Sequence, residues 1–284
     1  MSSEFVSQSE SSTARLAQRI LSSQQRRTLA LSGWAASELV DLARPSFWRN
    51  HRRLEACRDR HKGGRCFILG NGPSLADTDL TSLRGEIVFS LNRGYLIFPR
   101  LGFTPAYHVA INPLVVQQSG EELSGLEVDE LFVAWDQRRH VGRNPRTTFV
   151  RQVRGPWFGR DLAHGLWGGY TVTYAALQIA YFMGFKEVVL LGVDHRFVTE
   201  GEPNALHIST GPDQNHFDPN YFGPGVRWHL PDLTNSTLAY RLADIFYRAD
   251  GRRILDATVN GALDVFPKAE LADLVCRESG SIPR

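Results

Sequence analysis

The run Cys66–Leu75 constrains the fold more than any other segment, because an apolar stretch passes directly into a turn with two glycines. The apolar residues have the length of a strand that is buried on both faces. Pro73 and Ser74 are typical of the first residues of a helix. Since a helix N-terminus at a sheet edge favours anions, the segment predicts a phosphate-binding loop. It matches neither the dinucleotide fingerprint, because Leu75 stands where a small residue is needed, nor a Walker loop, because no Gly-Lys pair follows.

From Arg65 onward, short apolar runs alternate with longer segments of helical period. This alternation predicts an α/β fold, a Rossmann-like open, mostly parallel sheet with helices on both faces. The expected strands are 66–69, 87–91, 107–111, 131–135, 188–191 and 254–255, and the expected helices are 75–83, 169–184 and 233–249. Residues 197–232 are rich in Gly, Pro, Asn and His, and they predict a long lid-like loop.

The N-terminal part differs in composition from the rest of the chain. Residues 1–13 are serine-rich and expected to be disordered, and residues 14–64 are expected to form a basic helical extension. Residues 1–65 hold twelve Lys or Arg against six Asp or Glu, whereas the rest holds 20 against 24. We expect residues 65–284 to form one catalytic domain. Two interpretations of the extension stay open: a solvated extension packed on that domain, or a segment drawn to an anionic membrane surface.

Cysteine usage and hydropathy bear on the compartment. The three cysteines are odd in number and far apart, which argues against a disulfide framework and favours a reducing cytoplasm. No apolar run approaches the roughly 20 residues of a membrane span, and the N-terminus lacks a signal-peptide stretch. We therefore expect a cytoplasmic protein, with peripheral contact at the inner face of the membrane as an alternative. Nucleic acid is not an expected partner, because the main body has no basic excess, and a homo-oligomer stays open.

Polar residues follow four different apolar runs. Asn71, Asn92, Asn112 and Asp194 each stand at the carboxyl end of an expected strand, where such folds bind their ligands. An amide offers a donor and an acceptor without charge, which suits the edges of a nucleotide. The alternative for each residue alone is a turn residue that caps its strand.

Several of these segments resemble, in order from about 66 to 266, the CMP-sialic-acid-dependent sialyltransferases that decorate bacterial lipooligosaccharide. The resemblance lies in Gly70–Leu75, Asn92, Asn112-Pro113 and Gly192–Asp194. The same signatures mark a wider bacterial family, labelled 6-hydroxymethylpterin diphosphokinase-like (MptE-like) and found among surface-polysaccharide genes. Residues 215–223 and 228–233 are similar to a signature of that wider group. The resemblance implies a glycosyltransferase that moves a sugar, from a CMP-activated acidic sugar, to a cell-surface glycan or lipid-linked precursor with inversion.

The resemblance also implies roles for individual residues. A histidine just before a late helix would be the general base that deprotonates the acceptor hydroxyl; His229 falls near that position and His216 competes with it. Where the sialyltransferases hold the leaving phosphate with tyrosine, this chain has Arg196, with Arg227 or Tyr221 to assist it. The expected nucleotide-binding residues are Asn71, Gly72, Pro73, Ser74, Asn92, Asn112, Asp194 and Asn260. The expected donor-sugar residues are Gly169, Tyr170 and Thr171.

No metal or other cofactor is expected. Asp77-Thr78-Asp79 matches the D-x-D pattern of another glycosyltransferase fold, but acidic residues at a helix start are expected from the helix dipole. One alternative function is an ATP- and magnesium-dependent pterin diphosphokinase, which needs clustered acids where residues 110–113 have none. The other is a non-catalytic nucleotide-sugar-binding protein of a polysaccharide assembly complex.

Overall fold

The computed structural model describes residues 44–198 and 201–275. The chain divides into two units, Met1–Arg52 and Arg53–Arg284, and everything below concerns the second unit. The expectations for residues 1–13 and for most of the basic extension lie outside the described residues. Residues 53–64 belong to the second unit, where Leu54 and Cys57 are buried.

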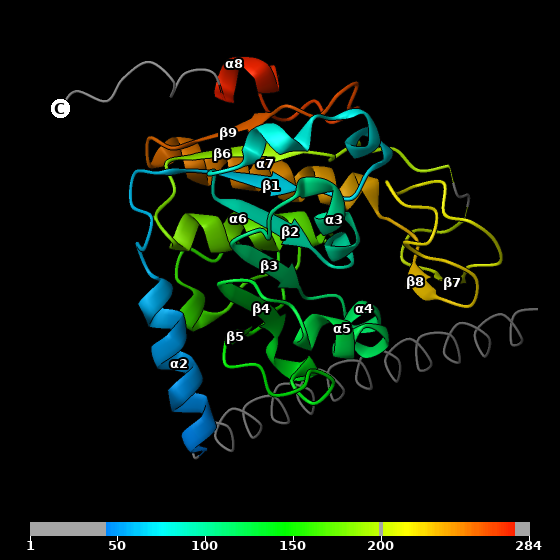
Figure 1. Ribbon diagram of the computed structural model, residues 1–284. Helices are drawn as coiled ribbons and strands as arrows, with labels where there is room; N and C mark the ends of the chain where they lie inside the picture. Colours follow the sequence, from blue (N-terminus) through cyan, green and yellow to red (C-terminus); the bar gives the residue numbers. More distant parts are fainter. Residues whose placement is uncertain (1–43, 199–200, 276–284) are drawn as a thin grey trace, which may run out of the picture. The chain divides into compact units, whose positions relative to one another are not determined.

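A seven-stranded sheet forms the centre of this unit, in the order β5-β4-β3-β2-β1-β6-β9 (Figure 1). Every neighbouring pair in it is parallel. The strands are β1 (Arg65–Leu69), β2 (Val88–Leu91), β3 (Tyr107–Ala110), β4 (Glu130–Ala134), β5 (Thr147–Val150), β6 (Glu187–Leu191) and β9 (Arg253–Asp256). The predicted α/β fold with a mostly parallel sheet is therefore confirmed.

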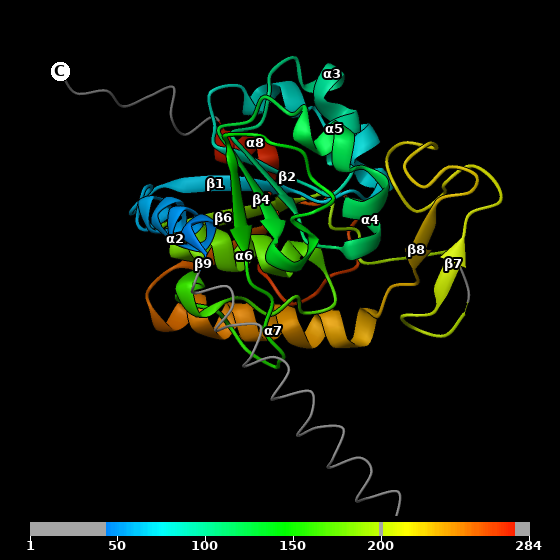
Figure 2. The same ribbon diagram turned by 90° about the horizontal axis from the view of Figure 1, so that it is seen from below.

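Helices cover both faces of the sheet, as predicted, with α6 and α7 on one side and α3 and α5 on the other (Figure 2). Strand β1 shows why, because its alternate side chains enter two different cores: Ile68 packs on the α6 and α7 side, and Phe67 on the other. The α-helices are α2 (Pro45–Cys57), α3 (Phe98–Leu101), α4 (Pro113–Gln118), α5 (Gly120–Ser124), α6 (Val172–Phe182), α7 (Leu233–Ala249) and α8 (Leu271–Val275).

The expected helix over 75–83 is wrong in type. It consists of two 3₁₀ helices, η1 (Pro73–Asp77) and η2 (Leu80–Leu83), separated by Thr78 in an extended conformation. Asp79 starts the second one, because its carboxylate accepts hydrogen bonds from the backbone N–H (3.1 Å) and hydroxyl (2.6 Å) of Thr81. The further 3₁₀ helices are η3 (Gly94–Ile97), η4 (Trp135–Gln137) and η5 (Leu162–His164).

The predicted long loop over 197–232 contains a short antiparallel hairpin of β7 (Leu206–Ile208) and β8 (Arg227–His229). The loop also has an apolar cluster of its own, in which Tyr221, Phe222 and Trp228 pack with Val115 of α4. Its residues 201–232 thus pack as part of the unit. Within 44–198 and 201–275, no helix combines the length and apolarity needed to cross a membrane.

The sheet order changes direction at β1, because the chain continues from β1 to β2 on one side and β6 lies on the other. Ligands of open α/β sheets bind outside the carboxyl ends of the strands at such a switch point. The loops after β1 and β6 therefore mark where a site is expected.

Candidate active site

A cavity of about 1070 Å³ opens at the carboxyl ends of the strands. Loops after β1, β2, β3 and β6, the N-termini of α6 and α7 and part of the 197–232 loop line it. The predicted site residues in this lining are Asn71, Gly72, Asn92, Asn112, Gly169, Tyr170, Thr171, Asp194, Arg196, His216, Tyr221 and His229. Pro73, Ser74, Arg227 and Asn260 are not in the lining.

Two asparagines of the lining carry side-chain oxygens without partners. The Oδ1 atoms of Asn71 and Asn92 are both buried and accept no hydrogen bond within the described part of the chain. Asn92 has a positive φ of 51°, and His108 Nε2 lies 2.8 Å from its backbone oxygen. Because buried polar atoms are normally satisfied, the two oxygens indicate a place for hydrogen-bond donors of a ligand.

The loop after β1 is pressed against the loop after β6. A Cβ on Gly72 would lie 1.9 Å from Asp194 Oδ2, so only glycine fits there. Ser74 donates its backbone N–H to Asp194 Oδ1 (3.1 Å) and its hydroxyl to Oδ2 (2.7 Å). The Asp194 carboxylate thus occupies the N–H and hydroxyl of Ser74, which were expected from the sequence to bind a phosphate. The Ser74–Asp194 hydrogen bonds connect the two loops.

Asn112 also has a local partner. Its Oδ1 accepts hydrogen bonds from the backbone N–H groups of Leu114 (3.0 Å) and Val115 (3.4 Å) and caps α4. Only its amide NH₂ is left for a ligand, whereas Asn71 and Asn92 offer their oxygens.

The N-terminus of α6 opens into the cavity behind the expected donor-sugar residues. Gly169 and Tyr170 both have positive φ values, 57° and 65°, and a Cβ on Gly169 would lie 2.3 Å from the ring of Tyr174. Thr171 caps the helix by accepting a hydrogen bond from the N–H of Thr173 at 3.3 Å. This eleven-residue helix presents its positive dipole end to the cavity, which favours an anionic ligand group.

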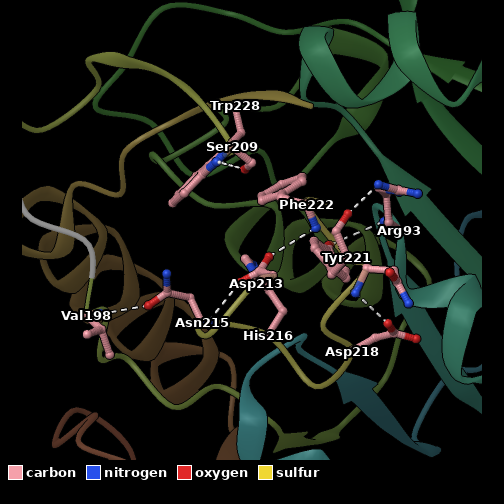
Figure 3. Close-up of polar contacts among 11 residues, drawn as sticks. Arg93, Val198, Ser209, Asp213, Asn215, His216, Asp218, Tyr221, Phe222 and Trp228 are labelled. Atoms are coloured by element: carbon pink, nitrogen blue, oxygen red, sulfur yellow. Dashed lines mark hydrogen bonds and ion pairs between the residues drawn. The ribbon is translucent and has the colours of Figure 1, made fainter. Parts of the chain in front are cut away.

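Three histidines line the cavity in different environments. His216 is partly buried, with Nδ1 2.7 Å from Asp213 Oδ2 and its ring stacked on Tyr221 at a centroid distance of 4.0 Å (Figure 3). His229 is exposed on β8. His195 lies with Nε2 2.8 Å from Thr237 Oγ1, and burial lowers its pKa.

The expected phosphate-binding residues are dispersed. Arg196 is exposed, and its guanidinium donates a hydrogen bond to the backbone oxygen of Asn260. Arg227 is exposed on β8. Tyr221 is only 1% exposed, its hydroxyl accepts a hydrogen bond from the backbone N–H of Arg93 (3.3 Å), and burial raises its pKa.

Acidic side chains of the cavity serve as helix caps. Asp194 binds Ser74, and Asp232 caps α7 by accepting from the N–H of Asn235 at 3.0 Å. Among residues 44–198 and 201–275 there is no group of three or more His, Cys, Asp or Glu placed to hold a metal ion.

Sequence reasoning missed Asp213, His195 and Arg93. The guanidinium of Arg93 donates to the backbone oxygen of Tyr221 and so fastens the 197–232 loop to the end of β2. A local signal existed only for Asp213, whose spacing of three residues from His216 allows a contact within one turn. The positions of the other two depend on tertiary packing.

Comparison with known proteins gives one family and a distant structural neighbour. The family model described as "6-hydroxymethylpterin diphosphokinase MptE-like" matches residues 46–200. No curated protein matches the chain. The MAf glycosyltransferase from Magnetospirillum magneticum AMB-1 is similar in structure, with a TM-score of 0.48 and 15% identity over 75% of this chain. This chain spans 34% of the length of that protein.

Proposed function

The chain belongs to the 6-hydroxymethylpterin diphosphokinase MptE-like family, and we propose that it is a glycosyltransferase that uses a CMP-activated acidic sugar. The acceptor in this proposal is a cell-surface glycan or its lipid-linked precursor. The unpaired oxygens of Asn71 and Asn92 carry the proposal, because both are buried in the lining of one cavity at the switch point of the sheet. Ribose hydroxyls and the exocyclic amine of cytosine are donors of the kind that such oxygens accept.

The remaining lining supports an anionic donor. Arg196, the amide NH₂ of Asn112 and the N-terminus of α6 are donors, while Asp194 and Asp232 are occupied as caps. Positive groups without free carboxylates stabilise a phosphate leaving group as its charge develops. The proposal requires no metal.

Transfer would occur by direct displacement with inversion. The acceptor oxygen attacks the anomeric carbon, the bond from that carbon to the phosphate oxygen breaks with its electron pair, and CMP leaves. A histidine takes the proton of the acceptor hydroxyl. Both His216 and His229 line the cavity and are the candidates for this role.

A nucleotide panel tests the proposal. Thermal unfolding is measured with CMP, CDP, UDP, GDP and ATP, each with and without magnesium. A ligand at 100 times its dissociation constant should stabilise the fold by about 2.7 kcal/mol, which is enough to rank the panel. We expect CMP to give the largest shift and magnesium to leave it unchanged. Stabilisation by ATP only with magnesium would contradict the proposal.

The family description favours one rival, a pterin diphosphokinase. That reaction transfers diphosphate from ATP and uses magnesium, so the same panel separates the two functions. A non-catalytic binding protein is the other rival. It predicts CMP binding with no release of CMP from CMP-N-acetylneuraminate in the presence of any sugar acceptor.

A further inference from the structure

We infer that Asp213 is the positioning residue of a dyad in which His216 is the general base. The inference rests on the proposed function for the chemical step, but the dyad itself can be tested without turnover. Both residues lie beyond residues 46–200, so the family match assigns them no role. His229, which the sequence order favours as the base, then has a different role in the cavity.

The geometry of the pair fixes which nitrogen of His216 can act. Its Nδ1 lies 2.7 Å from Asp213 Oδ2, and the two side chains are 11% and 3% exposed. A carboxylate only accepts, so Nδ1 carries the proton and the lone pair of the neutral ring is on Nε2. Nε2 has no protein partner within the described part of the chain, and His216 lines the cavity, so this nitrogen is available to an acceptor hydroxyl.

Aromatic rings prevent the imidazole of His216 from turning. Tyr221 stacks on it with an interplanar angle of 8°, and Phe222 meets it edge-on at a centroid distance of 5.0 Å. The ring of Phe197 lies on another side of the imidazole, at a centroid distance of 6.0 Å. A general base must hold its lone pair in one direction, and this packing supplies that constraint.

Backbone groups hold the Asp213 carboxylate in place independently of its contact with His216. Its Oδ1 accepts a hydrogen bond from the backbone N–H of Asn215 (2.7 Å), and its Oδ2 accepts one from the backbone N–H of Phe222 (3.1 Å). The backbone N–H of Asp213 donates to the backbone oxygen of Pro219 (2.8 Å). Burial alone would raise the pKa of the Asp213 carboxyl, but the bonds from His216 and the two backbone groups outweigh it and lower the pKa. The result is a fixed anion behind Nδ1, which stabilises the imidazolium that forms when Nε2 takes a proton.

The other cavity histidines lack this arrangement. Among the residues that the structure describes, no carboxylate contacts His229, which is exposed. His195 bonds Thr237, whose hydroxyl donates to the backbone oxygen of Leu233 at 2.7 Å, so the proton of the neutral His195 ring is on Nε2. His216 and His195 therefore differ in tautomer, which is a measurable property.

Proton–nitrogen NMR of the full chain at mildly alkaline pH tests the dyad. The His216 signals, assigned with His216→Gln, should show a protonated Nδ1 and a bare Nε2. In Asp213→Ala, Nδ1 loses its only acceptor within the described part of the chain, so the Nδ1-protonated form should no longer be held and the Nε2-protonated form should appear. The matched control is Asp218→Ala, because within the described part of the chain the carboxylate of Asp218 accepts only from the backbone N–H of Asn220 (2.7 Å) in the same loop. The control should leave the His216 signals unchanged.

The kinetic arm uses release of CMP from CMP-N-acetylneuraminate with a glycan acceptor. We expect Asp213→Asn to lower kcat at least 100-fold, with KM for the donor and CMP binding changed less than twofold. A protonated Nε2 in the wild type, or a tautomer unaffected by Asp213→Ala, overturns the dyad. Full turnover by His216→Gln also overturns it. If the wild type releases no CMP, the proposed function fails, and the NMR result still decides whether the dyad exists.

Discussion

Asn71 follows β1 and Asn112 follows β3, yet the side-chain oxygens of these two asparagines have different partners. Pro113 starts α4 directly after Asn112, so the asparagine becomes the helix cap. After Asn71 the cap of η1 is supplied by Asp194, which leaves the asparagine oxygen free. The identity of the asparagines could be predicted from the sequence, but which oxygens are available to a ligand depends on these tertiary contacts.

At the residue scale, Gly72→Ala should destabilise the protein by about 1–3 kcal/mol, because the new Cβ would lie 1.9 Å from Asp194 Oδ2. Chemical denaturation measures the loss. Gly125→Ala is the control, since its Cβ would lie 3.5 Å from the nearest atom, in ordinary contact. Equal stability of the two variants would contradict the close approach of the β1 and β6 loops.

His108 gives a pH-dependent prediction at the same scale. It is fully buried between Ser90 Oγ (2.6 Å from Nδ1) and the backbone oxygen of Asn92, and burial lowers its pKa from 6.5 to about 4. Because the unfolded chain takes up the proton first, the free energy of unfolding should fall as pH decreases from 6.5 to about 4. The full contribution is about 3 kcal/mol.

The measurement compares unfolding of the wild type and His108→Gln across this pH range. As pH falls, the free energy of unfolding should decrease more for the wild type than for His108→Gln. The variant His140→Gln, at an exposed position, should show the same pH dependence as the wild type. Parallel curves for the wild type and His108→Gln would show that His108 is not held neutral. Since His108 supports the backbone of Asn92, a change in nucleotide binding by His108→Gln is expected as well.

At the scale of elements, the segment 213–222 closes over the ends of β1 and β2. The N–H of Phe217 donates to the backbone oxygen of Asn71 (3.0 Å), and Arg93 donates to Tyr221. The same segment carries Asp213 and His216. Its position therefore links the asparagine pair to the proposed base.

Arg93→Gln should loosen this segment, because it removes the guanidinium bond to Tyr221. Hydrogen exchange of the amides of 213–222 should become at least tenfold faster, while the central strands stay protected. Arg84→Gln is the matched control, since Arg84 makes an equivalent bond to the backbone oxygen of Gly102 (2.8 Å) elsewhere. Unchanged exchange in Arg93→Gln would contradict the closure.

The sequence predicted elements well where periodicity was strong. The apolar run of β6 and the long patterns of α6 and α7 lie where expected. Strand β5 (Thr147–Val150) was not expected, because it begins with two threonines and so lacks the continuous apolar run of the other strands. The 75–83 segment has a helical pattern, but the capping of η2 by Asp79 divides it, and capping geometry is not visible in hydrophobic periodicity.

At the scale of the whole second unit, the cavity of about 1070 Å³ lies where the strand order of the parallel sheet reverses. Strand ends from both sides of β1, helix termini and the 197–232 loop all contribute to it. The segments that meet there are far apart in the sequence. This is why residue types of the site could be read from the chain, whereas the places of Arg93 and His195 in it could not.

Calorimetric titration with CMP tests the central claim most directly, that the oxygens of Asn71 and Asn92 hold a nucleotide. Each of Asn71→Ala and Asn92→Ala should weaken CMP binding by about 1 kcal/mol, roughly fivefold in Kd, and the double variant should weaken it further. Asn220→Ala, an exposed asparagine outside the cavity lining, should bind as the wild type does. Wild-type affinity in both single variants, or no CMP binding by the wild type, would contradict the account.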